Sequence, residues 1–324
     1  MSDTTGHESA PGAHGETPVP PAAPGAQPER TPTAPGPDTG RVAAWRLLAG
    51  NPVTLVSGIA LAVIVLVSVL APWIAPYGIN DVNVVDALQG PSGAHWFGTD
   101  DLGRDIFSRV LVAGGTSLRI ALVSVAFAFV VGVPVGIVSG YTGGVLDTVL
   151  MRVVDVMFAF PVLLLALAIV AILEPGELTT MLAIGIVYTP IFARVARAST
   201  LSVRVERYVQ VSQTMGTLAR TILVRHVLPN ITGPIVVQTS LSLAFAILSE
   251  AALSFLGLGI QPPDPSWGGM LFNAQGFISQ AWWMSIFPGA AIFITVLACN
   301  LLGDGLRDVL DPKQRTLAEQ RRMR

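Results

Sequence analysis

The chain has 324 residues, of which 52% are hydrophobic and only 12% are charged, and its mean hydropathy is +0.62. This composition leaves too little polar surface to solvate a globule of that size, which excludes a soluble domain. The net charge of −2 argues against a nucleic-acid partner, because phosphate binding needs a clustered basic face. We therefore predict an all-α integral membrane protein.

Residues 1–40 are rich in Pro, Ala, Gly and Thr, a composition typical of disordered segments. This stretch has neither the basic n-region nor the apolar h-region of a signal peptide. We predict a retained, flexible cytoplasmic tail, followed by a membrane domain over residues 41–312 and a basic cytoplasmic tail over residues 313–324.

Six apolar segments are long enough to cross about 30 Å of hydrocarbon. The predicted membrane spans cover residues 53–73, 117–139, 146–173, 179–198, 231–256 and 283–302. The fourth span contains Pro190 and has Arg194 near its end.

The distribution of cations predicts the orientation of the spans. The loops after the first, third and fifth spans, together with the adjoining start of the second span, contain only Arg104, Arg109 and Arg119, mixed with aspartates. The other Arg residues and the single Lys fall in the tails, in the remaining loops or near their ends. Because cations near span ends are retained in the cytoplasm, we predict a multi-pass plasma-membrane protein with both termini and the 204–230 loop inside.

The first outer loop contains the string HWFGTDDLGRDIFSRV. We predict that Thr99 or Asp100 caps a short helix with acidic residues near its positive end, and that Arg109 pairs with Asp105 four residues earlier. A metal site would recruit His95 and the aspartates. The interleaved arginines and the absence of typical ligand spacing argue against it.

Two features lie inside the predicted spans. Gly132, Gly136 and Gly140 form a small-residue face, which we assign to close packing within the chain. Asp155 lies one helical turn after Arg152, and we predict a structural ion pair between them, because an unpaired charge at membrane depth is costly.

The longest polar interruption between spans is the string VERYVQVSQTMGTLARTILVRHVLPN. Five of its residues fall at helical spacing and predict an apolar stripe on a short helix: Val205, Tyr208, Val209, Ser212 and Met215. Gly216 ends this helix. A second helical run ends at Leu228 and Pro229, after which Asn230 can cap the next span. The stripe cannot be buried by so short a helix alone, so a partner protein or the membrane surface must cover it.

After the fifth span comes the string SEAALSFLGLGIQPPDPSWGGML. Its glycines are expected to end the span, and its prolines to stiffen an extended outer loop. We predict that Trp267, Trp282 and Trp283 lie at the outer membrane interface.

The cytoplasmic loop resembles the EAA loop of permease subunits in ATP-binding-cassette importers. The resemblance rests on Gly216, on Tyr208 and Val209 before it, and on Leu228-Pro229 after it. The string RHVLPN is similar to the dipeptide, oligopeptide and nickel branch. Where the family has Glu-Ala-Ala, this chain has Gln210-Val211-Ser212.

Two outer strings resemble the same branch. One is its GTD-x-x-GRD signature, with Gly98, Thr99, Asp100, Gly103, Arg104 and Asp105. The other is the loop that contains Pro262, Pro263, Trp267 and Gly268. In order, the three strings cover most of residues 53–312.

The resemblance implies the type I importer permease fold and import of di- or oligopeptides. In that family the cytoplasmic loop is a coupling helix that docks on the ATPase. The implied partners are a second homologous permease, one or two ATPase subunits, an extracytoplasmic substrate-binding protein and the lipid bilayer. The chain would bind no cofactor, and ATP and Mg²⁺ would bind the ATPase subunits.

The chain is not itself predicted to be an enzyme. A Walker A loop needs Gly-Lys-Ser/Thr, and the only lysine is Lys313, preceded by Pro312. A nickel importer of the same family and, from another class, an ion-gradient transporter stay open as alternatives. Glu250, in the fifth span with no cation within four residues, either faces the translocation pathway or a partner span, or has a hydrogen-bonded structural role.

Overall fold

The computed structural model describes residues 52–310. Within this range the secondary structure is helical, apart from one isolated β-bridge between Thr99 and Asp105. The predicted tails 1–40 and 313–324 lie outside the described residues.

The long helices have the following bounds: α2 Pro52–Ile74, α3 Ile106–Thr142, α4 Gly144–Phe158, α5 Val162–Leu173, α6 Glu177–Arg204, α9 Leu228–Phe255 and α11 Trp283–Leu310. The short elements are η1 Val84–Asp86, α7 Arg207–Thr214, α8 Ala219–Ile222, the π-helical turn η2 Leu223–Val227, α10 Trp267–Ala274 and η3 Gln275–Phe277.

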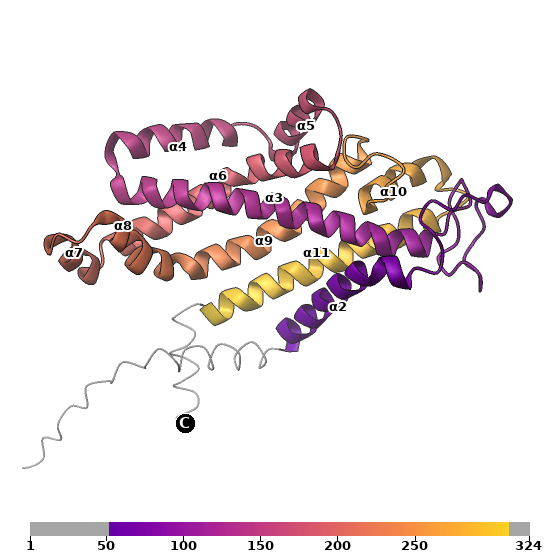
Figure 1. Cartoon of the computed structure of the whole chain (residues 1–324), viewed down its shortest axis with the longest axis horizontal. Coiled ribbons are helices and arrows are strands. Elements are labelled where there is room, and N and C mark those ends of the chain that lie inside the picture. Colours follow the sequence, from indigo (N-terminus) through magenta and orange to yellow (C-terminus); the bar gives the residue numbers. More distant parts are fainter. Residues whose placement is uncertain (1–51, 311–324) are drawn as a thin grey trace, which may run out of the picture.

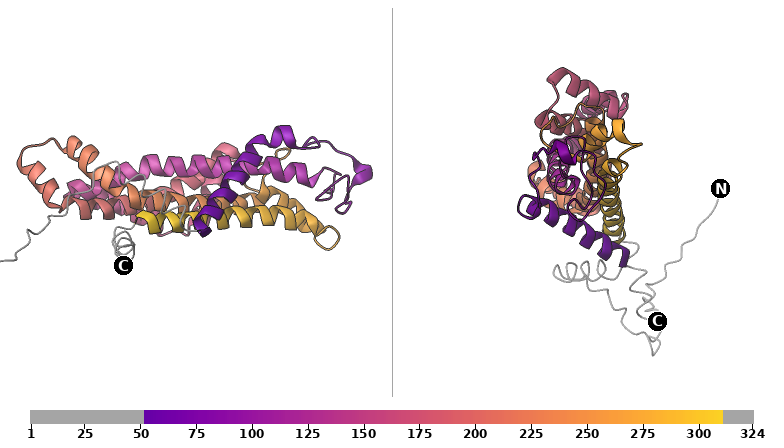
Figure 2. Two further views of the ribbon diagram at one scale, coloured as in Figure 1. Left: turned by 90° about the horizontal axis from the view of Figure 1, so that it is seen from below. Right: turned by 90° about the vertical axis from the view of Figure 1, so that its right-hand side faces the viewer.

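The helices form one elongated bundle (Figure 1). Helices α3, α6 and α9 pack on one another in its middle, while α2 lies beside α11 on one side and α4 and α5 lie on the other. Helices α7 and α8 project at one end, and α10 and the outer loops occupy the opposite end. In Figure 2, the left view shows the two ends of the bundle apart, and the right view shows α2 and the α4–α5 pair on opposite sides.

Five of the six predicted crossings correspond to single helical runs, and the third corresponds to a bent pair of helices. Five helical runs are long and apolar enough to span a membrane, and the α4–α5 pair supplies a sixth crossing if it counts as one bent span. Most helices extend past the predicted bounds. Hydropathy marks only the apolar part of a helix, whereas backbone hydrogen bonding continues into polar residues.

The third span is not continuous, contrary to the prediction. Helices α4 and α5 meet at an angle of 88° across Ala159–Pro161. Pro161 supplies the reason, because proline has no N–H to donate and disfavours helical backbone in the residue before it. The span therefore contains a break that an averaged hydropathy does not reveal.

The glycine face of α3 packs against α6, as predicted. A Cβ atom on Gly132 would lie 2.5 Å from the Thr189 carbonyl oxygen, and one on Gly140 would lie 2.8 Å from that of Arg197. Such distances are too short for any side chain. The glycines thus let two spans of this chain approach closely.

Candidate functional site

Helix α7 is the predicted cytoplasmic helix, and it is shorter than the predicted segment from Arg204 to Met215. It ends at Thr214, two residues before Gly216, whose φ of +75° is a conformation that glycine adopts readily. The Gly216 N–H donates to the Gln213 carbonyl at 3.0 Å and the Thr217 N–H to the Ser212 carbonyl at 3.1 Å. Gly216 therefore closes the helix, as expected.

The predicted apolar stripe is divided between the interior and the surface. Val209 is fully buried, in the same hydrophobic cluster as Ile222 and Val227 of the α8–η2 run. Ser212 is half-buried. The other members, Val205, Tyr208 and Met215, are exposed, and so are Val211 and Leu218, which lie outside the stripe.

Two polar contacts tie α7 and its neighbouring residues to the end of α3. The Arg204 guanidinium donates to the Gly140 carbonyl, and the Gln213 amide to the Tyr141 hydroxyl, both at 3.4 Å. The Tyr208 ring lies 5.9 Å from the His226 ring. Partial burial, and secondarily the Glu206 carboxylate, raise the pKa of Tyr208 above its ordinary value. A force on α7 would therefore reach the long spans through several contacts.

The expectation that Pro229 ends a helix is wrong. Helices α8, η2 and α9 form one run from Ala219 to Phe255, with Leu228 and Pro229 exposed in the first turn of α9. The π-helical turn before Pro229 accommodates a residue that cannot donate and would clash in a regular helix. Asn230 does not act as a cap, since its side-chain amide donates to the His226 carbonyl at 2.6 Å.

In the outer loop, Asp105 caps α3 itself, in place of Thr99 or Asp100 capping a separate helix. The Asp105 carboxylate accepts from the Ser108 N–H at 2.8 Å. Asp100 accepts from the Arg104 side chain at 2.6 Å and from the Arg104 N–H at 2.9 Å. The predicted Arg109–Asp105 pair does not form: Arg109 donates to the Ile79 carbonyl at 2.5 Å and lies 4.0 Å from Asp100.

Gly98, Thr99 and Gly103 shape the same loop. The two glycines have φ values of +75° and +76°, and a Cβ on Gly98 would lie 2.6 Å from the Gln89 carbonyl oxygen. The Trp283 indole donates to the Thr99 carbonyl at 3.1 Å. The GTD-x-x-GRD string thus builds a rigid turn fixed to α11.

The second outer string packs inward. Pro262 and Pro263 are exposed, but Trp267 is 3% exposed, and its indole donates to the Val110 carbonyl at 3.0 Å. Gly268 lies against α9, where a Cβ would be 2.7 Å from the Ala251 Cα. The interface prediction is wrong for Trp267 and Trp283, which are both buried, while Trp282 is exposed.

Glu250 lies beneath this outer loop and is fully buried. One of its carboxylate oxygens accepts from the Ser254 hydroxyl at 2.8 Å, and the Ser117 and Ser266 side chains face the same carboxylate. Its Oε2 atom has no hydrogen-bond partner. These contacts favour the hydrogen-bonded alternative for Glu250.

Two aspartates of the outer loop, Asp100 and Asp105, are already engaged by donors, whereas the buried Oδ1 atom of Asp101 has no hydrogen-bond partner. His95 Nδ1 lies 2.9 Å from an Asp105 oxygen, and the Asp100 oxygens accept from Arg104. Within residues 52–310, no three His, Cys, Asp or Glu side chains are grouped so that they could hold a metal ion.

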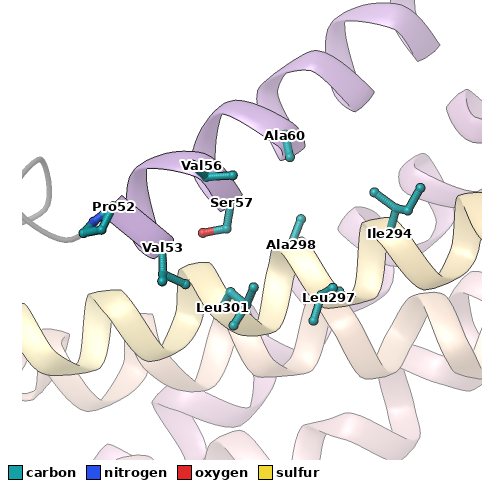
Figure 3. Close-up of a pocket in the computed structure, with 9 residues that line it drawn as sticks. All are labelled: Pro52, Val53, Val56, Ser57, Ala60, Ile294, Leu297, Ala298 and Leu301. Carbon is teal, nitrogen blue, oxygen red and sulfur yellow. The ribbon is translucent and has the colours of Figure 1, made fainter.

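An apolar cleft of about 380 Å³ lies between α2 and α11 (Figure 3). A single hydroxyl, that of Ser57, joins the hydrophobic residues around it. The cleft is lined by Pro52, Val53, Val56, Ser57, Ala60, Ile294, Leu297, Ala298 and Leu301. It offers no charged group to a polar solute.

Two ion pairs join α4 to α6, and neither was predicted. Asp155 pairs with Arg194 at 2.6 Å, not with Arg152 as expected, and Asp147 accepts from Arg197 at 2.6 and 2.7 Å. The acids and arginines are about 40 to 50 residues apart in sequence. The only signal for them in the sequence was the presence of acidic and basic residues within apolar spans.

Comparison with known families finds two matches. Residues 132–316 match the family described as binding-protein-dependent transport system inner membrane component. Residues 42–91 match the N-terminal TM domain of oligopeptide transport permease C.

Three relatives align over most of this chain. The probable D,D-dipeptide transport system permease protein DdpC of Escherichia coli (strain K12) is 43% identical over 82% of this chain and 90% of its own length. The dipeptide transport system permease protein DppC of Alkalihalophilus pseudofirmus is 42% identical over 84% and 90%. The glutathione transport system permease protein GsiD of Pectobacterium atrosepticum is 43% identical over 83% and 90%.

A solved structure has a similar fold. A chain in inward-facing crystals of the MetNI methionine ABC transporter superposes with a TM-score of 0.51 at 18% identity, over 60% of this chain and 93% of that one. This likeness confirms the predicted importer permease fold.

Proposed function

Because this chain belongs to the family of binding-protein-dependent transport system inner membrane components, we propose that it is the permease through which di- or oligopeptides enter the cell. It is a multi-pass membrane subunit of an ABC importer and has no ATPase activity of its own. The three relatives above carry dipeptide or glutathione names, which supports a peptide over the nickel alternative.

The proposal that this chain is coupled to an ATPase rests on one observation, the exposed apolar surface of the cytoplasmic loop. Val205, Val211, Met215 and Leu218 lie uncovered around α7, while Val209 fixes the helix to the bundle. An apolar patch of this kind beside polar residues is typical of a protein interface. We propose that the ATPase subunit covers it.

In this mechanism α7 transmits closure of the ATPase dimer to the spans. The ATP-bound dimer must bind one conformation of the permease more tightly than the other, because a partner with equal affinity for both shifts nothing. The contacts of Arg204 and Gln213 with the end of α3 support rigid transmission.

The family implies an ATPase and a substrate-binding protein as partners. We further propose that a second, homologous permease completes the pathway, that one or two ATPase subunits dock beneath the pair, and that ATP and Mg²⁺ bind there and not to this chain. In this scheme the loop around Trp267 lines the outer gate of the pathway, beneath the binding protein, and the string around Thr99 is a periplasmic element that leads into α3.

The proposal is tested with the tagged chain expressed with the genes of its candidate partners. An ATPase should co-purify, and the complex in liposomes should take up labelled dipeptide only with ATP and the binding protein. Ni²⁺ in excess should not compete. Uptake by this chain alone under an ion gradient would support a secondary transporter instead, and nickel uptake without peptide uptake would identify the alternative substrate.

A further inference from the structure

The ion pair between Asp155 of α4 and Arg194 of α6 is half-exposed at membrane depth. Its nitrogen and oxygen are 2.6 Å apart, and the Arg194 and Asp155 side chains are 49% and 52% exposed. Arg194 lies ten residues before the cytoplasmic end of α6 at Arg204 and seventeen after its start at Glu177. At about 1.5 Å per residue it is roughly 15 Å from one end of α6 and roughly 25 Å from the other, and it lies inside the predicted span 179–198, near the end of that span.

The break in the third span lies next to this pair. The Arg194 guanidinium carbon lies 3.9 Å from the centroid of the Phe158 ring, the last residue of α4. The residues of the break, Ala159 to Pro161, are exposed as well. A charged pair and a stretch of non-helical backbone therefore share one exposed surface.

A surface that combines a charged pair with non-helical backbone is not stable in contact with lipid hydrocarbon. Non-helical backbone at membrane depth occurs only where protein covers it or water fills a cavity beside it, and ionisable residues there face the same surroundings. The bare surface of this chain at the break must therefore face another subunit or a water-filled space, and the charges of Asp155 and Arg194 favour the water-filled space.

We propose that Asp155, Phe158, Phe160 and Arg194 line the translocation pathway and that the ion pair binds the charged ends of a passing peptide. Arg194 would receive the peptide carboxylate and Asp155 its ammonium group. This inference rests on the proposed function, and it names the zwitterionic backbone of a free peptide as the recognised feature.

The chemistry of the pair suits this role. The guanidinium carries five N–H donors in a planar fork that matches a carboxylate, and its ion pair uses one nitrogen and one Asp155 oxygen. While no substrate is present, each side chain neutralises the other. A zwitterion can replace both partners at once, so neither charge is left uncompensated in a region of low dielectric constant.

The second pair between the same helices differs. Two nitrogens of Arg197 donate to both oxygens of Asp147, the Ser139 hydroxyl also donates to this carboxylate, and the exposed fractions are 33% and 16%. All the carboxylate oxygens are occupied. Asp147 and Arg197 therefore fasten α4 to α6, and the open pair is Asp155 with Arg194.

A first experiment tests for the water-filled space without reference to substrate. Cys299 is the only cysteine and is buried, so a single new cysteine in the assembled complex can be labelled selectively after Cys299→Ser. Phe160→Cys should react with a charged, membrane-impermeant thiol reagent in the nucleotide-free or the ATP-bound state. Val63→Cys on α2, a position of nearly equal exposure (52% against 54%), should stay unreactive. Equal protection of both cysteines in both states would overturn the proposal.

A second experiment tests substrate contact in the reconstituted complex. Arg194→Gln and Asp155→Asn should each reduce dipeptide uptake about tenfold or more, the loss expected for one charged hydrogen bond. Uptake is to be compared per assembled complex, measured by the amount of ATPase that co-purifies. Arg152→Gln, an exposed cation on α4, should leave uptake within about twofold of the wild type.

The charge exchange Asp155→Arg with Arg194→Asp separates recognition from structure. It restores an ion pair between α4 and α6 but reverses the charges that a peptide meets, so uptake should stay low. Recovery of uptake by the exchange, or normal uptake by both single variants, would overturn the proposal. A wild-type complex that imports no peptide would contradict the proposed function instead, while the thiol experiment would still test the pathway.

Discussion

Val209 and Met215 belong to the same short cytoplasmic segment, yet the first is fully buried and the second is 80% exposed. Val209 joins the hydrophobic cluster of the bundle, and Met215 stands at the end of α7, beside the Gly216 turn. One side chain anchors the helix to its own subunit, and the other is presented outward. The two positions should therefore respond differently to the same substitution.

Val209→Asp should destabilise the cytoplasmic end of the bundle. A carboxylate at this position would be buried without a partner, at a cost of several kcal/mol. We expect less assembled complex in the membrane and a lower melting temperature of what remains. Val224→Asp, at an exposed position of η2 outside the proposed docking surface, is the matched control for folding. Equal melting temperatures for wild type and Val209→Asp would show that Val209 is not buried.

The apolar spans and the coupling segment follow from sequence because both depend on local patterns. A span can be predicted from its length and hydropathy alone. Helix α7 can be predicted from apolar residues at helical spacing before Gly216. The break at Pro161 was missed because a hydropathy average takes no account of a single missing N–H donor. The π-helical turn before Pro229 was missed for a related reason, since the same residue can end a helix or be accommodated within one.

Glu250→Leu should destabilise the outer end of the bundle more than Glu250→Gln does. Glutamine keeps an oxygen that can accept from the Ser254 hydroxyl, whereas leucine removes the acceptor and leaves buried hydroxyls unpaired, at about 1 to 3 kcal/mol. Thermal unfolding of the purified complex measures the difference. If Glu250→Gln assembles normally but abolishes transport, the carboxylate has a direct role in the pathway.

Trp267→Phe should loosen the contact between α10 and α3. A smaller aromatic ring replaces the indole, and the Val110 carbonyl loses the indole donor, which should cost about 0.5 to 1.5 kcal/mol for the hydrogen bond alone. Hydrogen exchange at residues 266–274 should become faster. Trp282→Phe, at an exposed tryptophan, is the control, and unchanged exchange in Trp267→Phe would count against an anchoring role.

Long-range partners could not be read from the sequence. Asp155 was assigned to Arg152 because they are one turn apart, but its partner lies on α6, 39 residues away. Trp267 and Trp283 were predicted to lie at the membrane interface. A tryptophan near the end of a span can lie at that interface or pack inside the protein, and the sequence does not distinguish the two. Which groups a side chain meets depends on how the spans pack, and local spacing does not specify that packing.

The account depends most on α7 as the contact between this permease and its ATPase. The most direct measurement is ATP hydrolysis by the Met215→Asp complex, with and without loaded binding protein. A carboxylate in the centre of an apolar interface should cost about 2 kcal/mol or more, so we predict that the subunit inserts normally while the stimulation of hydrolysis and the uptake of peptide fall at least about tenfold. Wild-type stimulation of hydrolysis in Met215→Asp would contradict the account.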